Sequence, residues 1–266
     1  MKESLTPTSP ALSSSPSLPQ PSSPDTKYVY RRYDEFSSTL QSQLYSLPPN
    51  SECRLLLSKG IDKTPQLSPH TVVLQQKKDE GKGGARVDDC ETKDDTNDRM
   101  TIIYPKGSTY NVKKKYILPI TQENQLIIVS PETTDYRRLC IVQTPKDHSF
   151  IEIGCAFAFT VGNVDCSKRL GIDKSPSSLE LAKKNFPTLD LEELDVLVES
   201  KEGLMNILER YEMNDCGKLI VAIDINGNRE LEAVVECLQR ILDVWRPRLV
   251  IVKSRSLFKL MNDQGT

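Results

Sequence analysis

Histidine is scarce in this chain, which has 266 residues and two histidines, His70 and His148. No Cys-x-x-Cys pair occurs among its seven cysteines, which are scattered at positions 53, 90, 140, 155, 166, 216 and 237. A zinc site or a histidine-based catalytic triad is therefore poorly supplied. An odd number of cysteines without metal spacing is typical of reduced, mostly buried thiols inside a cell. We predict no metal site.

Long apolar runs are also absent, and none approaches the roughly 18 residues that a membrane-spanning helix needs. The formal net charge is −2, so the chain as a whole does not attract polyanions. No basic, aromatic-rich face supports a nucleic-acid partner. The N-terminus lacks the apolar core of a secretory signal, and no arginine precedes Arg31, which argues against a mitochondrial presequence. We therefore expect a soluble, cytoplasmic protein without a membrane partner; the serine-rich start leaves a plastid location open, and a nuclear one is open too.

Composition divides the chain into five segments. Residues 1–26 are rich in serine and proline and are expected to be a disordered tail, and residues 27–76 are expected to be partly ordered. Residues 77–99 form a charged run without periodicity, which is typical of a linker. Residues 100–134 alternate short β-like pieces with turns and predict a small antiparallel β unit. Its expected strands are Thr101–Tyr104, Tyr116–Ile120 and Gln125–Val129.

Residues 135–266 alternate apolar runs with amphipathic, helix-period segments. The expected strands are Phe150–Ile153, Arg169–Ile172, Leu189–Leu194, Leu219–Ile223 and Leu249–Val252. Ser175 and Pro176 are the residues preferred at the start of a helix, and Leu231–Trp245 has apolar residues at every helical position of one face. Such alternation predicts right-handed crossovers and a mostly parallel sheet. We predict a Rossmann-like α/β three-layer sandwich with strand order 3-2-1-4-5.

Polar residues and a glycine follow directly on these expected strands. They are Gly154, Asp173, Asp195, Asp224 and Lys253. In an open parallel sheet, ligands bind outside the carboxyl ends of the strands. A glycine lets the backbone approach a ligand closely, and Asp173 lies 19 residues after Gly154, close to the spacing of about 20 for an acid that binds a ribose. The pattern indicates a nucleoside site.

Two of these segments resemble the first two motifs of class I S-adenosylmethionine-dependent methyltransferases. They are Phe150-Ile-Glu-Ile-Gly-Cys155 and Gly171-Ile-Asp-Lys-Ser-Pro-Ser-Ser-Leu-Glu-Leu-Ala182. The family patterns are Glu-x-Gly-x-Gly-x-Gly and Gly-[Ile/Val]-Asp-x-Ser-x-x-x-Leu-x-x-Ala, and the resemblance covers roughly residues 136–255. It implies S-adenosylmethionine as the cofactor and a small-molecule methyl donor as the partner, with the methyl group transferred by in-line displacement.

The resemblance also implies roles for individual residues. Glu152 and Gly154 would hold the methionine end of the cofactor, and Asp173 the ribose. Asp195 and Val196 would meet the adenine edge. The implied cofactor set is completed by two further residues of the motifs, Ala156 and Lys174.

Asp224 and Lys253 are the candidate catalytic residues. The resemblance places Asp224 near the reactive methyl group. The pair is similar to the aspartate and lysine of RNA 2′-O-methyltransferases, in which the lysine lowers the pKa of the target hydroxyl. A lysine that ends a strand at the solvent edge is the alternative interpretation of Lys253. The methyl acceptor is not indicated by any motif.

The sequence departs from the family pattern in its glycine loop, which reads Gly154-Cys-Ala-Phe-Ala158 and has alanine at two of three glycine positions. Alanine replaces glycine without strain only where φ is negative. The expected fifth strand is followed by too few residues for the family's sixth and seventh strands. Two functions therefore stay open: an S-adenosylmethionine-dependent methyltransferase, and a catalytically inactive Rossmann-like binding or regulatory module. An NAD-linked oxidoreductase is disfavoured because Gly-x-Gly-x-x-Gly is absent.

Overall fold

The computed structural model describes residues 18–23, 26–43, 52–55, 71–75, 99–103, 109–113, 117–225 and 231–264. Residues 1–17 of the predicted tail, and residues 77–98 of the predicted linker, lie outside this range. None of the helices in the described part of the chain combines the length and the hydrophobicity that a membrane span requires.

The centre of the fold is a seven-stranded sheet with the order β1-β7-β12-β11-β8-β9-β10. Every neighbouring pair in it is parallel. The strands are β1 (Val29–Arg32), β7 (Leu126–Ser130), β8 (Ser149–Ile153), β9 (Lys168–Asp173), β10 (Asp190–Glu193), β11 (Leu219–Ile223) and β12 (Leu249–Lys253). All residues of β7 and β11 are buried, as expected of parallel strands that are covered on both faces. The fold is Rossmann-like α/β.

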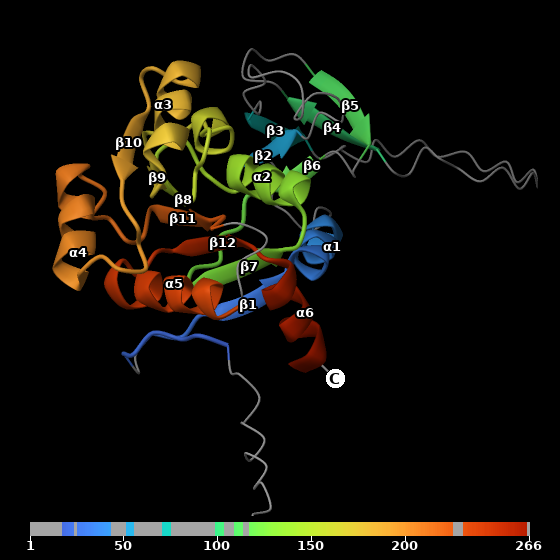
Figure 1. Ribbon diagram of the computed structural model, residues 1–266. Helices are drawn as coiled ribbons and strands as arrows, with labels where there is room; N and C mark the ends of the chain where they lie inside the picture. The colour runs from blue at the N-terminus through green and yellow to red at the C-terminus, as the bar shows by residue number, and fades with distance from the viewer. Residues whose placement is uncertain are drawn as a thin grey trace, which may run out of the picture.

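Helices cover both faces of the sheet (Figure 1). One face packs against α1 (Tyr33–Gln43), α2 (Thr133–Val142), the short η3 (Val161–Asn163) and α3 (Pro176–Asn185). The other packs against α4 (Lys201–Arg210), α5 (Leu231–Val244) and α6 (Arg255–Gln264). Ser175 caps α3 as predicted, because its side chain accepts a hydrogen bond from the Ser178 N–H.

The strand order differs from the predicted 3-2-1-4-5. The five expected strands follow one another in that sequence from β10 to β12, but the sheet continues with β7 and β1 beyond β12. The expectation that Gln125–Val129 belongs to the antiparallel unit is wrong, since β7 pairs in parallel with β12. Its run Leu-Ile-Ile-Val is apolar at every position, which is typical of a strand buried on both faces. Two segments from the first half of the chain thus extend the sheet.

The N-terminal segment also differs from the predicted tail. Residues 18–23 lie against α5, where the Ser22 N–H and hydroxyl both donate to Asp243, at 2.6 and 2.9 Å. The Gln20 side-chain amide donates to the Tyr28 carbonyl and accepts from the Tyr28 N–H, both at 2.9 Å. The Gln20 side chain thus pairs with the backbone of Tyr28, the residue just before the edge strand β1.

A second, antiparallel sheet has five strands in the order β5-β4-β3-β2-β6. The strands are β2 (Glu52–Leu55), β3 (Thr71–Gln75), β4 (Arg99–Ile103), β5 (Thr109–Lys113) and β6 (Ile117–Pro119). A small antiparallel unit was expected in residues 100–134. β4 and β6 lie near two of the expected positions, β5 was not expected, and β2 and β3 come from residues 52–75.

Candidate functional site

The carboxyl ends of four central strands bring the predicted polar residues into one row. Ile153 of β8 pairs with Ile172 of β9 and with Ile223 of β11, and Ile223 pairs with Val252 of β12. The next residues of these strands are therefore neighbours across the sheet edge. They are Asp173, Gly154, Asp224 and Lys253.

A crevice opens at this edge between β8 and β11. The segment after β8 leads to η3 on one face of the sheet, whereas the segment after β11 leads to α5 on the other face. Such a divergence is the switch point at which ligands bind in open α/β sheets. The candidate site therefore occupies the position that the sequence predicts.

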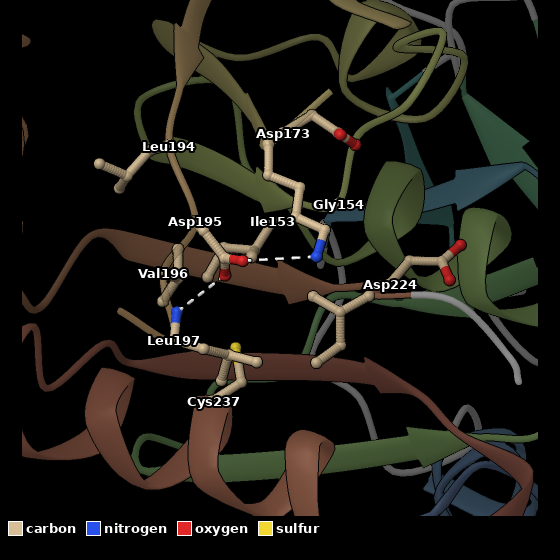
Figure 2. Close-up of a pocket in the computed structure, with 11 residues that line it drawn as sticks. Ile153, Gly154, Asp173, Leu194, Asp195, Val196, Leu197, Asp224 and Cys237 are labelled. Carbon is tan, nitrogen blue, oxygen red and sulfur yellow. Dashed lines mark hydrogen bonds and ion pairs between the residues drawn. The ribbon is translucent and has the colours of Figure 1, made fainter. Parts of the chain in front are cut away.

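The crevice forms an open pocket with a cavity volume of about 60 Å³. That volume is below the roughly 300 to 1,000 Å³ of most pockets that enclose small molecules and cofactors. The lining residues are Ile153, Gly154, Asp173, Lys174, Leu194, Asp195, Val196, Leu197, Asp224, Ile225 and Cys237 (Figure 2). Six of the nine predicted site residues are among them, and Glu152, Ala156 and Lys253 are not.

Asp195 is the acid that lies most centrally in the pocket. Figure 2 shows its carboxylate among the lining side chains, while the carboxylates of Asp173 and Asp224 point away from it. One oxygen accepts a hydrogen bond from the Leu197 N–H at 3.1 Å, and the other lies 3.4 Å from the Lys174 ammonium. A carboxylate has about four acceptor positions, so Asp195 retains capacity for a ligand donor.

Apolar side chains form the walls next to Asp195. Val196 is 3% exposed, and Leu194, Leu197 and Ile225 line the same hollow. A flat aromatic ring suits such walls, because it buries apolar faces while its edge reaches the polar group between them.

Asp173 faces the loop after β8 rather than the centre of the pocket. Its two oxygens accept hydrogen bonds from the Ala156 N–H and the Ser175 N–H, both at 2.9 Å. The Asp173 carboxylate thus links the loop after β8, through Ala156, to Ser175 at the start of α3. Ala156 acts through its backbone, and its side chain does not line the pocket.

The backbone conformation and the close approach of Asp224 both require glycine at position 154. Its φ is +77°, and a Cβ built on it would lie 2.2 Å from the Asp224 carbonyl oxygen. Alanine stands at φ +45° in Ala156 and at +60° in Ala158. L-residues adopt this left-handed region at a cost, so the two alanines introduce strain into the loop.

Glu152 does not reach the pocket, which differs from its implied role at the methionine end of a cofactor. It is 2% exposed. Its carboxylate accepts hydrogen bonds from the Tyr136 hydroxyl at 3.0 Å and from the Val161 N–H at 2.9 Å. Burial raises the pKa of Glu152 to about 7. This acid connects β8 to α2 and to the loop.

Lys253 lies beside the pocket and pairs with Asp224. Its ammonium is 3.0 and 3.1 Å from the two Asp224 oxygens, and the side chains are 19% and 20% exposed. The ion pair keeps the Asp224 carboxylate at the end of β11. The two candidate catalytic residues are therefore adjacent, as their positions at neighbouring strand ends require.

Several residues of the site were not predicted. Leu194 and Ile225 adjoin the predicted acids in the sequence, so their proximity to the site could have been inferred. Cys237 comes from α5, and no local signal connects it to the strand ends. In the described part of the chain, no group of three or more histidine, cysteine, aspartate or glutamate side chains is placed to hold a metal ion.

No protein-family model matches the chain, and no curated protein matches its sequence. Among solved structures, the chain is similar to a TehB-like SAM-dependent methyltransferase from Corynebacterium glutamicum. The identity is 16%, the match covers 48% of this chain and 70% of the other, and the TM-score is 0.35.

Proposed function

We propose that this chain binds S-adenosylmethionine in the pocket between β8 and β11 and transfers its methyl group to an acceptor. One observation carries the proposal. Gly154, Asp173, Asp195, Val196 and Asp224, which the strand ends and the motif resemblance indicate in the sequence, all line one hollow at the switch point of the sheet.

The residues of the pocket fit the nucleoside part of this cofactor. The Asp195 carboxylate can accept a hydrogen bond from an exocyclic amine, and Val196 and Ile225 can cover the faces of the ring. Lys174 can give way to that amine, because its 3.4 Å contact with Asp195 is long and its side chain is half exposed. Asp173 has acceptor positions left for a ribose hydroxyl.

The residues that line the pocket carry a small excess of negative charge. They include three acids, Asp173, Asp195 and Asp224, and one lysine, Lys174, and of the three acids only Asp195 directs its carboxylate into the hollow. Lys253 compensates Asp224 from the side, so one negative charge is left in excess near the site, which favours a cationic ligand. When bound, the cofactor would supply an electrophilic methyl group on a positively charged sulfur, and the residues of the chain would contribute chiefly by positioning the reactants.

The acceptor side of the proposed reaction is assigned to Asp224 and Lys253. The lysine holds Asp224 at the end of β11, and a nearby ammonium would lower the pKa of an acceptor hydroxyl.

A catalytically inactive binding module is the second candidate, and two observations favour it. Both Asp173 oxygens already accept backbone hydrogen bonds from the chain. The alanines at 156 and 158 occupy left-handed backbone positions, so the loop lacks the freedom that glycine would provide for close approach to a ligand.

Calorimetry of the full chain with S-adenosylmethionine and S-adenosylhomocysteine separates the candidates. We expect micromolar binding that Asp195→Asn weakens at least tenfold, or about 1.4 kcal/mol. Asparagine still accepts from the Leu197 N–H, so the loop after β10 keeps its shape. The matched control is Glu193→Gln, since Glu193 is exposed and does not line the pocket. Absence of heat at millimolar ligand would favour the inactive module.

A further inference from the structure

Residues 18–23 lie along the outer side of α5 and β1 (Figure 1), and they are attached in the manner of a bound peptide. In the described part of the chain, the backbone of residues 18–22 makes no hydrogen bond to the backbone of the sheet or of α5. Pro19 and Pro21 are nevertheless buried, and Leu18 packs against the core. The edge strand β1 joins the sheet without this segment, because it pairs with β7. Side chains therefore hold the segment in place.

The surface that receives the segment, which we call the docking surface, consists of two tyrosines at β1 and two polar residues of α5. They are Tyr28, Tyr30, Gln239 and Asp243. Gln239 and Asp243 are four positions apart in the sequence, so they share one face of the helix. Tyr28 is 1% exposed, and its hydroxyl donates to the Pro247 carbonyl at 2.6 Å. The docking surface is thus anchored in the fold.

Two backbone carbonyls of the segment accept hydrogen bonds from the docking surface. The Tyr30 hydroxyl donates to the Pro19 carbonyl, and the Gln239 amide donates to the Gln20 carbonyl at 2.6 Å. Burial raises the pKa of Tyr30 well above its ordinary value, so its hydroxyl stays a donor at neutral pH. Aromatic side chains that pack against prolines, together with donors that bind the carbonyls between them, are the means by which proteins recognise proline-rich segments.

Gln20 and Ser22 add contacts that depend on the identity of their side chains. The Gln20 amide donates to the Tyr28 carbonyl and accepts from the Tyr28 N–H, as a neighbouring strand would. The Ser22 N–H and hydroxyl both donate to the Asp243 carboxylate. Burial alone would raise the pKa of Asp243, but the hydrogen bonds from Ser22 lower it on balance, so this acceptor is ionised at neutral pH. The docking surface therefore contacts every residue of the pattern Leu-Pro-Gln-Pro-Ser.

We propose that the docking surface is a recognition site for proline-rich protein segments of the pattern Leu-Pro-Gln-Pro-Ser, and that residues 18–22 are its built-in occupant. A partner segment has to displace this occupant before it can bind. Because the occupant belongs to the same chain, its local concentration is on the order of millimolar, and its presence lowers the apparent affinity for a partner. The inference is independent of the proposed methyl transfer, since the candidate pocket lies between β8 and β11.

A fluorescently labelled peptide with the sequence of residues 16–25 tests the inference on the full chain, with binding measured by anisotropy. Gln20→Ala combined with Pro21→Asp vacates the docking surface and leaves its residues unchanged. The first substitution removes both hydrogen bonds to Tyr28, and the second places a charge at a buried position. We expect this double variant to bind the peptide at least about tenfold more tightly than the wild type, in which the occupant keeps the surface filled.

Amide hydrogen exchange of the ¹⁵N-labelled double variant locates the bound peptide. The Tyr28 N–H loses its acceptor in this variant, so its protection should fall, and saturating peptide should restore it. A peptide with alanine in place of its glutamine should restore nothing, because it lacks the oxygen that accepts from this N–H. Gln239→Ala added to the double variant removes a donor of the docking surface and should weaken the peptide by about threefold or more.

Ser22→Glu is a second variant that alters an exposed residue, so the fold should tolerate it. Its negative charge faces Asp243, which should loosen the occupant and raise the affinity for the peptide. Lys27→Ala, also at an exposed residue, is the matched control and should bind the peptide as the wild type does. Absence of binding to either vacated variant at millimolar peptide would overturn the inference. Equal affinities of both variants and the wild type would also overturn it, because the peptide would then bind elsewhere.

Discussion

Gly154→Ala tests whether the close approach of two strand ends shapes the candidate site. The added methyl group would lie 2.2 Å from the Asp224 carbonyl oxygen and 2.7 Å from its carbon, and both atoms are backbone. The residue would also have to keep a φ near +77°, at a cost of roughly 1–2 kcal/mol. Overpacking adds about 1–3 kcal/mol. We expect a loss of about 2–5 kcal/mol in the free energy of unfolding.

Urea unfolding of the full chain measures this loss through the fluorescence of the single tryptophan. Trp245 is fully buried, and its indole N–H donates to the Leu204 carbonyl at 2.8 Å, so its emission should change on unfolding. The control is Gly217→Ala, whose methyl group would meet only the Asp215 side chain at 3.3 Å. A loss below about 1 kcal/mol for Gly154→Ala, or equal losses for both variants, would refute the reasoning.

Three further variants probe the loop, the N-terminal segment and the buried acid. Ala156→Gly relieves a positive φ at an exposed position. After the entropy cost of glycine is subtracted, it should raise the free energy of unfolding in urea titrations by up to about 1 kcal/mol. A decrease in that free energy would show that Ala156 is not strained. Asp243→Ala removes the acceptor of Ser22 and should speed amide exchange in residues 18–23 while changing global stability by less than about 1.5 kcal/mol; unchanged exchange would show that the contact does not hold the segment. Burial raises the pKa of Glu152 from 4.5 to about 7, so its contribution to the free energy of unfolding falls as pH rises between these values, by up to about 3 kcal/mol. The free energy of unfolding of Glu152→Gln relative to the wild type should therefore grow between pH 5 and pH 8. A constant difference would contradict the assignment.

Local patterns in the sequence determined the elements of the second half of the chain. Apolar runs marked the strands β8, β9, β11 and β12, and a helix-period stripe marked α5. A serine followed by proline marked the start of α3. These signals are local, because burial on both faces and helical periodicity are recorded in consecutive residues. The acids after the strands could be placed at one edge for the same reason, since parallel strands end on the same side of a sheet.

Tertiary structure alone decided which distant segments complete the sheet and which predicted residues face the pocket. The sequences of β1 and β7 do not indicate which strands they pair with, because pairing across roughly a hundred residues depends on the whole fold. In the sequence, Glu152 and Asp173 are both acids of the two motifs, and both were expected to contact the cofactor. In the structure one is buried beneath the loop and the other holds it from the pocket side. Side-chain direction and burial come from packing against α2 and the loop, which no local pattern encodes.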